Sequence, residues 1–286
     1  MEELKKIALK NLQNQHFDTL AVGVIDFSQE TFESFEVHNQ KDLDTGLDFY
    51  FDLASLTKPL TLASTYQLHK NLFDEKSIRL LNHRAGLISG GRISPKGWRK
   101  YIKDFFVSTS DQDTIYSDYS ALRTMVEVEE RAKRPLYELC SSFWDEELVS
   151  WLDLPWDCFS PVTGTRHNFP ICGEVHDDNA YYLDEKVSHA GLFSTIGGLC
   201  RSLLNLNSND QLLKHMDEVF NDFPNQRFKG GWDTVTDLEN TLAGKGCGER
   251  TFGHLGFTGT SIWIDLDKKR GAVILTNATQ NYWYDR

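Results

Sequence analysis

A serine and a lysine three positions apart are the first candidates for chemistry in this sequence. Ser55 and Lys58 form a Ser-x-x-Lys pattern inside the stretch FDLASLTK, which begins at Phe51. On a helix this spacing puts both side chains on one face, where they can touch. A serine hydroxyl needs a base within hydrogen-bond reach, and a lysine serves as that base only when its pKa is lowered. The pair is therefore a candidate nucleophile and base, although so short a pattern occurs about once by chance in a chain of this length.

The residues around this pair predict a strand, a turn and then a helix. A β-type run precedes Ser55, and an amphipathic pattern follows it to about Lys70. Pro59 is tolerated there because the first-turn N–H groups of a helix have no intrahelical partner. The first turn also lies at the positive end of the helix dipole, so the N–H of Ser55 could face a reacting carbonyl.

The composition narrows the class of protein. The chain has 286 residues, enough for one large domain or two interleaved ones, and its net charge is −12. An acidic chain argues against nucleic acid and anionic membranes as partners, and no apolar run approaches the roughly 20 residues of a membrane span. Five cysteines without close metal-type spacing favour a reduced, cytoplasmic setting. The N-terminus resembles an amphipathic helix rather than a signal peptide, although a mature exported chain restarted with methionine would look the same.

Strand-like segments occur at both ends of the chain, with helix-like segments between them. Residues 20–27 and 31–38 predict a hairpin, and short β-type runs separated by glycine-rich or charged turns follow Phe228. Helices are expected over 96–107, on both sides of Pro135 and from about Thr195. The stretch 151–179, rich in proline, glycine and aromatic residues, is expected to be long irregular structure.

This order predicts an α+β fold. Its centre would be one antiparallel sheet formed from both ends of the chain, with flanking helices and an inserted, mostly helical domain. We expect residues 1–62 and 226–286 to form the sheet domain, and residues 63–225 to form the helical domain.

Two more short motifs follow the Ser-x-x-Lys pattern in a fixed order: YSD from Tyr116 and HLG from His254. Longer stretches accompany them, among them LLNHRAGL, GEVHDDNAYY, SHAGLFST and FGHLGFTGTSIWID. With these motifs and flanks the chain resembles the serine β-lactamase and penicillin-binding-protein superfamily. The closest branch holds class C β-lactamases, DD-peptidases, D-aminopeptidases and related esterases. The resemblance covers nearly the whole chain and implies the β-lactamase/transpeptidase-like fold, in agreement with the strand–helix–strand order.

The resemblance implies a role for each residue of the first two motifs. Ser55 would be the acylated nucleophile, and Lys58 would help to deprotonate it and hold the local charge pattern. Tyr116 would shuttle a proton between Ser55 and the leaving group, for which its phenol needs cationic neighbours near neutral pH. No cofactor is needed for this chemistry, and the expected partner is a small-molecule or short-peptide substrate.

The third motif would lie on the inner edge strand. His254 takes the place of the lysine that is more common in the family. The backbone N–H groups of Ser55 and Phe257 would form the oxyanion hole. Gly256 would let the substrate lie against the strand, because a side chain there would block its approach.

Each of these residues also has an ordinary structural interpretation when it is considered alone. Tyr116 could pack or cap at a helix start, and Asp118 could be a helix N-cap ahead of YSALRTM. His254 could be a satisfied structural histidine. Only the joint occurrence of the motifs favours the catalytic interpretation.

A run of acidic residues and a histidine suggests a metal site, and we weighed it against loop structure. The run comprises Glu174, His176, Asp177 and Asp178. Adjacent ligands in one loop seldom complete a zinc shell, so we expect no metal and assign the run to a loop near the site. The Gly-x-Ser-x-Gly elbow of α/β-hydrolases is absent from the sequence, which removes that competing class of serine hydrolase.

The sequence departs from the family pattern in three places. Asp118 stands where asparagine is usual, and because an ionised aspartate only accepts hydrogen bonds, a substrate that offers a donor or a cation is indicated. A neutral His254 attracts a substrate carboxylate less than lysine would, so penicillin-type binding is not expected. The chain stops soon after VILTNATQ, so we expect the N-terminal helix or a partner chain to cover the sheet face where relatives have a final helix.

These observations lead to one main hypothesis and one alternative. The main hypothesis is a serine acyl-hydrolase that acts through a Ser55 acyl-enzyme on an ester or amide of a small D-amino-acid or cell-wall-derived substrate. Asp118, Gly256 and Phe257 are expected to contact that substrate. The alternative is a non-catalytic binding or regulatory protein on the same fold, which would bind cell-wall fragments without turnover. The oligomeric state is left open.

Overall fold

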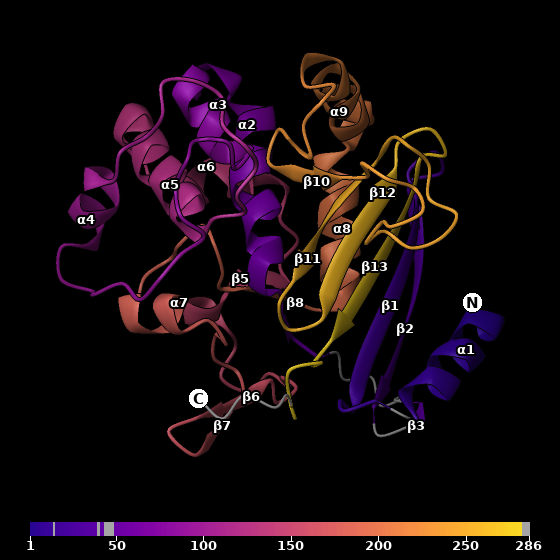
Figure 1. Cartoon of the computed structure of the whole chain (residues 1–286). Helices are drawn as coiled ribbons and strands as arrows, with labels where there is room; N and C mark the ends of the chain where they lie inside the picture. Colours follow the sequence, from indigo (N-terminus) through magenta and orange to yellow (C-terminus); the bar gives the residue numbers. More distant parts are fainter. Residues whose placement is uncertain (14, 39–40, 43–48, 282–286) are drawn as a thin grey trace.

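The computed structural model describes residues 1–13, 15–38, 41–42 and 49–281 (Figure 1). The α-helices are Glu2–Leu12 (α1), Ser64–Leu68 (α2), Glu75–Leu81 (α3), Trp98–Asp104 (α4), Asp118–Ala132 (α5), Leu136–Cys140 (α6), Asp178–Leu183 (α7), Ile196–Leu206 (α8) and Gln211–Asp222 (α9). The strands are Thr19–Asp26 (β1), Thr31–His38 (β2), Lys41–Asp42 (β3), Phe51–Asp52 (β4), Leu148–Ser150 (β5), Gly164–Arg166 (β6), Phe169–Ile171 (β7), Leu192–Ser194 (β8), Phe228–Lys229 (β9), Trp232–Thr234 (β10), Thr251–Gly256 (β11), Thr260–Asp265 (β12) and Arg270–Thr276 (β13).

The central sheet is antiparallel and joins the two ends of the chain. Its strand order is β3-β2-β1-β13-β12-β11-β10-β9. The join is made by β1, where Val22 pairs with Phe35 of β2 on one side and with Ile274 of β13 on the other. The predicted α+β fold, with a sheet built from both chain ends and helices around it, is confirmed.

Helix α8 covers one face of this sheet (Figure 1). The Thr195 hydroxyl caps it by accepting a 2.9 Å hydrogen bond from the Gly198 N–H. A Cβ on Gly23 of β1 would lie 2.5 Å from the Cys200 sulfur, so glycine allows the helix to approach closely. Helix α8 packs on the sheet although it falls within 63–225, and the division of the chain into two domains at the expected boundaries stays a prediction.

Helix α1 packs against β1 and β2, as the amphipathic N-terminal pattern predicted. Ala8 and Leu12 form a small apolar cluster with Leu20, Val22 and Val37. The helix therefore covers part of the sheet away from α8. No helix among the described residues is both long and apolar enough to cross a membrane.

Two segments differ from the sequence-based expectation. The stretch 151–179 is not irregular throughout, because it contains the β6–β7 hairpin and the first two residues of α7. The helix expected after Ser55 begins as a 3-10 turn, η1 (Ala54–Leu56), and a π-helical segment, η2 (Pro59–Ala63), before α2. Hydroxyl groups in this segment donate to backbone carbonyls, which competes with the regular helical ladder; Thr61 Oγ1 donates to Thr57 O at 2.7 Å.

Candidate active site

The turn that carries Ser55 is held by a buried carboxylate. Ala54, just before the serine, has a φ of +46°, a conformation that L-residues seldom adopt. Asp52 Oδ1 accepts a 2.8 Å hydrogen bond from the Ala54 N–H, and its Oδ2 accepts a 2.7 Å bond from the His176 N–H. Burial raises the pKa of Asp52 to about 7, against the effect of these two bonds. Asp52 thus connects the serine turn to the loop that precedes α7.

Lys58 is surrounded by three acceptors. Its Nζ lies 2.9 Å from Ser55 Oγ, 3.0 Å from the His189 carbonyl oxygen and 2.7 Å from Asp118 Oδ1. Burial alone would lower the pKa of Lys58, but the charges of Asp118 and Tyr116 outweigh it and raise that pKa above its ordinary value. Lys58 is therefore an ammonium with all three protons engaged, a state that has no lone pair to accept the Ser55 proton.

Tyr116 lies beside this ammonium at the edge of an aromatic cluster. Lys58 Nζ is 5.0 Å from the centre of the Tyr116 ring. The same ring contacts His83, Phe228 and His254, with ring centres 4.8, 5.7 and 5.8 Å apart. Tyr116 remains 37% exposed. Its phenol is thus held at a solvent-accessible position next to a buried cation.

Asp118 is the first helical residue of α5 and not its N-cap. Ser117 takes the capping position, where its Oγ accepts a 3.0 Å hydrogen bond from the Ser120 N–H. The carboxylate of Asp118 instead binds Lys58, because the helix start places it directly against the buried ammonium. The negative charge that the sequence suggested for a substrate cation is therefore compensated within the protein.

His254 on β11 is buried behind the ring of Tyr116. Burial and the nearby charge of Lys58 lower the pKa of His254 to about 3, so the ring is neutral at physiological pH. Its Nδ1 donates to the Leu255 carbonyl oxygen at 2.8 Å, which leaves Nε2 buried without a partner. His254 thus does not supply the positive charge of the lysine that it replaces.

The structure gives a steric reason for glycine at position 256, and the sequence alone did not show it. A Cβ on this residue would lie 2.5 Å from the Leu53 carbonyl oxygen and still closer to Thr260 Oγ1. Glycine therefore lets β11 pack directly against the Ser55 turn, and its expected role beside the substrate stays a prediction. The neighbouring Phe257 is 56% exposed.

The catalytic candidates open onto one cavity of about 260 Å³. Its lining residues are Ala54, Ser55, Tyr116, Asp118, His176, Asp177, His189, Ala190 and Phe257. Ser55, Tyr116, Asp118 and Phe257 are thus brought together as the sequence motifs predicted. Lys58, His254 and Gly256 are not among the residues that line it.

Asp177 and His189 form a pair in this wall that the sequence analysis did not assign. Asp177 Oδ1 caps α7 by accepting from the Ala180 N–H at 2.8 Å, and it also accepts from His189 Nε2 at 2.9 Å. The pKa of Asp177 is held below its ordinary value, because interactions headed by the charge of His189 outweigh the effect of burial. Asp177 lies in the run that the sequence analysis assigned to a loop near the site, and His189 lies in SHAGLFST, one of the stretches that carry the resemblance.

The other acidic residues of the expected loop are engaged elsewhere. Glu174 Oε1 and Asp178 Oδ1 both contact Arg166, at 2.8 and 3.3 Å. Over the described ranges of the chain, no three histidine, cysteine, aspartate or glutamate side chains are grouped so that they could hold a metal ion.

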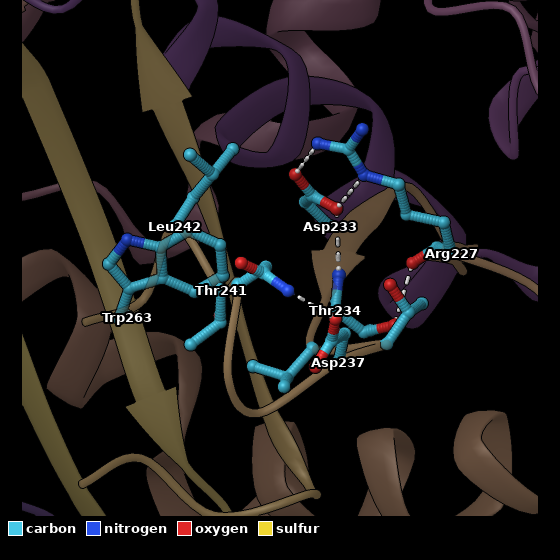
Figure 2. A pocket seen from close by; sticks show the side chains of 10 residues that line it. Arg227, Asp233, Thr234, Asp237, Thr241, Leu242 and Trp263 are labelled. Carbon is cyan, nitrogen blue, oxygen red and sulfur yellow. Dashed lines mark hydrogen bonds and ion pairs between the residues drawn. The ribbon is translucent and has the colours of Figure 1, made fainter. Parts of the chain in front are cut away.

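A second pocket of about 140 Å³ lies near the edge of the sheet (Figure 2). Arg227 binds Asp233 there through two hydrogen bonds of 2.8 and 2.7 Å, and Trp263 and Leu242 form the opposite wall. No serine, cysteine or histidine is among the residues that line it. The cavity at Ser55 is therefore the better candidate for catalysis.

Buried neutral histidines predict a loss of stability in acid. Burial lowers the pKa of His254 to about 3, that of His215 to about 4 and that of His83 well below its usual value. Unfolding restores an ordinary pKa of about 6.5, so below that pH the unfolded state binds more protons. We expect the free energy of unfolding to fall between about pH 6.5 and 4, by up to about 1.4 kcal/mol per pH unit for each histidine.

One buried carboxylate opposes this trend. The pKa of Asp52 is raised, so the folded state gains a proton there as the pH falls below about 7. Urea unfolding at several pH values between about 7 and 4 measures the net effect of the histidines and Asp52 on the free energy of unfolding. A stability that stays constant or rises on acidification would contradict the prediction.

Comparison with known proteins agrees with this fold. The family model described as Beta-lactamase matches residues 146–286. A search of curated protein sequences finds no significant match. The chain has the β-lactamase-like fold, with class C β-lactamase- and DD-carboxypeptidase-like structural neighbours. The family match over residues 146–286 and these structural neighbours agree with the resemblance to β-lactamase-like proteins.

Three solved structures illustrate the similarity. A β-lactamase from Mycobacterium bovis has 18% identity and a TM-score of 0.59, with 96% of this chain and 92% of that chain covered. The D-alanine carboxypeptidase AmpC from Burkholderia cenocepacia has 13% identity and a TM-score of 0.65, over 97% and 95%. SurE in complex with D-Leu has 14% identity and a TM-score of 0.65, over 97% and 71%.

Proposed function

We propose that this protein is a serine acyl-hydrolase that acts through a Ser55 acyl-enzyme. The substrate is an ester or amide of a small D-amino-acid or cell-wall-derived compound. The observation that carries this proposal is the 2.9 Å contact between Lys58 Nζ and Ser55 Oγ, in a cavity that Tyr116 also lines. The similarity in fold to a D-alanine carboxypeptidase and to SurE with D-Leu supports a D-configured substrate.

The geometry favours Tyr116 over Lys58 as the proton acceptor. In the phenolate form, which the Lys58 ammonium stabilises, Tyr116 takes the proton from Ser55 while Oγ bonds to the substrate carbonyl carbon. The negative charge that develops on the carbonyl oxygen is stabilised by the N–H groups of Ser55 and Phe257. The bond to the leaving group then breaks, and Tyr116 returns the proton to that group.

Deacylation repeats these steps with water. A water molecule attacks the acyl carbon and gives a proton to Tyr116, and the proton passes to Ser55 Oγ as the ester bond breaks. Lys58 remains an ammonium throughout, so its role is electrostatic and positional. The cycle ends with the acid released and the serine hydroxyl restored, and it draws on no cofactor.

Labelling of Ser55 tests the proposal. Purified protein is incubated with a fluorophosphonate or with a fluorescent penicillin, and intact mass is measured for the wild type and for Ser55→Ala. We expect one fluorophosphonate adduct on the wild type and none on the variant. Because His254 is neutral, penicillin labelling is expected to be much slower. Folded wild-type protein that reacts with neither probe would contradict the proposal and favour a non-catalytic binding protein.

A further inference from the structure

The wall of the Ser55 cavity has two carboxylates and no free cation. Asp118 and Asp177 both line it, with side chains 33% and 32% exposed, and none of its lining residues is a lysine or an arginine. Family-like substrates such as penicillins carry a carboxylate that needs a cation. The charges of this cavity are therefore the wrong sign for such a group.

Two cations near the Ser55 cavity, Lys58 and Arg227, are already paired with carboxylates. Lys58 is 3% exposed and directs its three protons at Ser55, His189 and Asp118. Arg227 forms a two-bond ion pair with Asp233. Neither can turn to a substrate carboxylate without leaving a buried or half-buried carboxylate unpaired, which is costly.

Asp177 is the carboxylate that remains available. Both hydrogen bonds that it makes with described residues use Oδ1, so Oδ2 has capacity for a further donor from the cavity. His189 Nε2 donates to Oδ1 from a ring that is almost fully buried, so it does not occupy Oδ2. The interactions around Asp177 outweigh burial and hold its pKa below the ordinary value, so the carboxylate keeps its negative charge at neutral pH.

We propose that the acyl group of the substrate carries an ammonium group, which Asp177 Oδ2 binds at the wall of the Ser55 cavity. The substrate class is thus an ester or amide of a free amino acid, with the amine unblocked. This inference rests on the proposed function and assigns its substrate class. It also moves the substrate cation from Asp118, where the sequence suggested it, to Asp177.

Two methyl esters that differ in one group test the proposal. D-alanine methyl ester carries an ammonium at about pH 6.5, and methyl isobutyrate carries a methyl group in its place. Hydrolysis is followed by NMR, and kcat/KM is divided by the hydroxide-catalysed rate of each ester to remove intrinsic reactivity. We expect the alanine ester to be preferred by about tenfold or more, the usual strength of a charge-assisted hydrogen bond. Raising NaCl from about 0.05 to about 0.5 M should reduce that preference.

A matched pair of variants locates the effect. Asp177→Asn removes the charge, and we expect the ratio of the normalised kcat/KM for the alanine ester to that for methyl isobutyrate to fall about tenfold. Asp178→Asn makes the same change one residue away, in a side chain that binds Arg166 and does not line the cavity, and it should keep the preference. If Asp177→Asn does not fold, the ammonium assignment is tested on the wild type alone, by the ratio of the normalised kcat/KM values for the two esters and by the effect of NaCl on that ratio.

The outcomes separate this inference from the proposed function. Equal normalised rates for the two esters, or a preference that Asp177→Asn leaves intact, would overturn the ammonium assignment and leave the acyl-hydrolase standing. If neither ester is hydrolysed, the test is whether D-alaninamide protects Ser55 from the fluorophosphonate better than isobutyramide does. Equal protection by the two amides would contradict the ammonium assignment. Absence of any Ser55 labelling would contradict the proposed function and this inference with it.

Discussion

Replacing Lys58 with methionine is expected to lower kcat/KM for any ester that the wild type cleaves by about 10³-fold. The substitution keeps the length and volume of the side chain but removes the ammonium that contacts Ser55 Oγ at 2.9 Å and lies 5.0 Å from the Tyr116 ring. Without that charge, proton transfer from Ser55 to Tyr116 loses the cation that stabilises it. Steady-state kinetics and the rate of fluorophosphonate labelling measure the loss.

A double variant separates this effect from a loss of stability. Lys58→Met alone leaves the Asp118 carboxylate without its partner, and because that side chain is part-exposed we expect a cost of about 2 kcal/mol in the free energy of unfolding. Adding Asp118→Asn removes the unpaired charge, so stability should largely return while activity should not. A single Lys58→Met variant that keeps near wild-type kcat/KM would show that the ammonium has no catalytic role.

Gly256→Ala is expected to cost about 3 kcal/mol of stability and to slow labelling of Ser55. The added methyl group would meet the Leu53 carbonyl oxygen and the Thr260 hydroxyl, which already donates to that carbonyl at 3.1 Å. Leu53 lies two residues before Ser55, so the clash can be relieved only by moving the serine turn away from β11. Thermal unfolding and the fluorophosphonate rate report the two consequences.

Gly90→Ala is the matched control. A Cβ on Gly90 would lie 3.7 Å from Asp118 Oδ2, an ordinary contact, although the residue is close to the same site. We expect a change in stability within about 1 kcal/mol and normal labelling. Similar losses of stability and of labelling rate in Gly256→Ala and Gly90→Ala would contradict the steric explanation at Gly256.

The strands and helices could be predicted where local pattern and tertiary role agree. The β1–β2 hairpin shows a β-type composition, and α8 carries Thr195 as a visible cap. The shape of the segment after Ser55 could not be predicted, because its π-helical turn depends on how hydroxyls such as Thr61 Oγ1 compete for backbone carbonyls. Helix α9 also went unassigned, although its sequence is amphipathic.

The candidate site was predictable in its residues but not in their partners. The three motifs identified Ser55, Tyr116 and Asp118, which the structure brings to one cavity. That Asp118 binds Lys58 depends on the angle at which α5 meets the serine turn, and no spacing in the sequence encodes that angle. The pairing of Asp177 with His189 likewise joins two loops whose approach is fixed by tertiary packing.

The connection between the two ends of the chain has a consequence for synthesis. The Thr19 N–H donates to Asn277 Oδ1 across 258 positions of sequence, and β1 lies between β2 and β13. During translation the N-terminal hairpin leaves the ribosome long before β13 exists, so one edge of β1 waits with its N–H and C=O groups unpaired. Closing so long a loop is entropically expensive and makes folding slow. We expect the sheet, and with it the Ser55 turn, to form only after the last strand has been released, so nascent chains should depend on holding factors that cover β1.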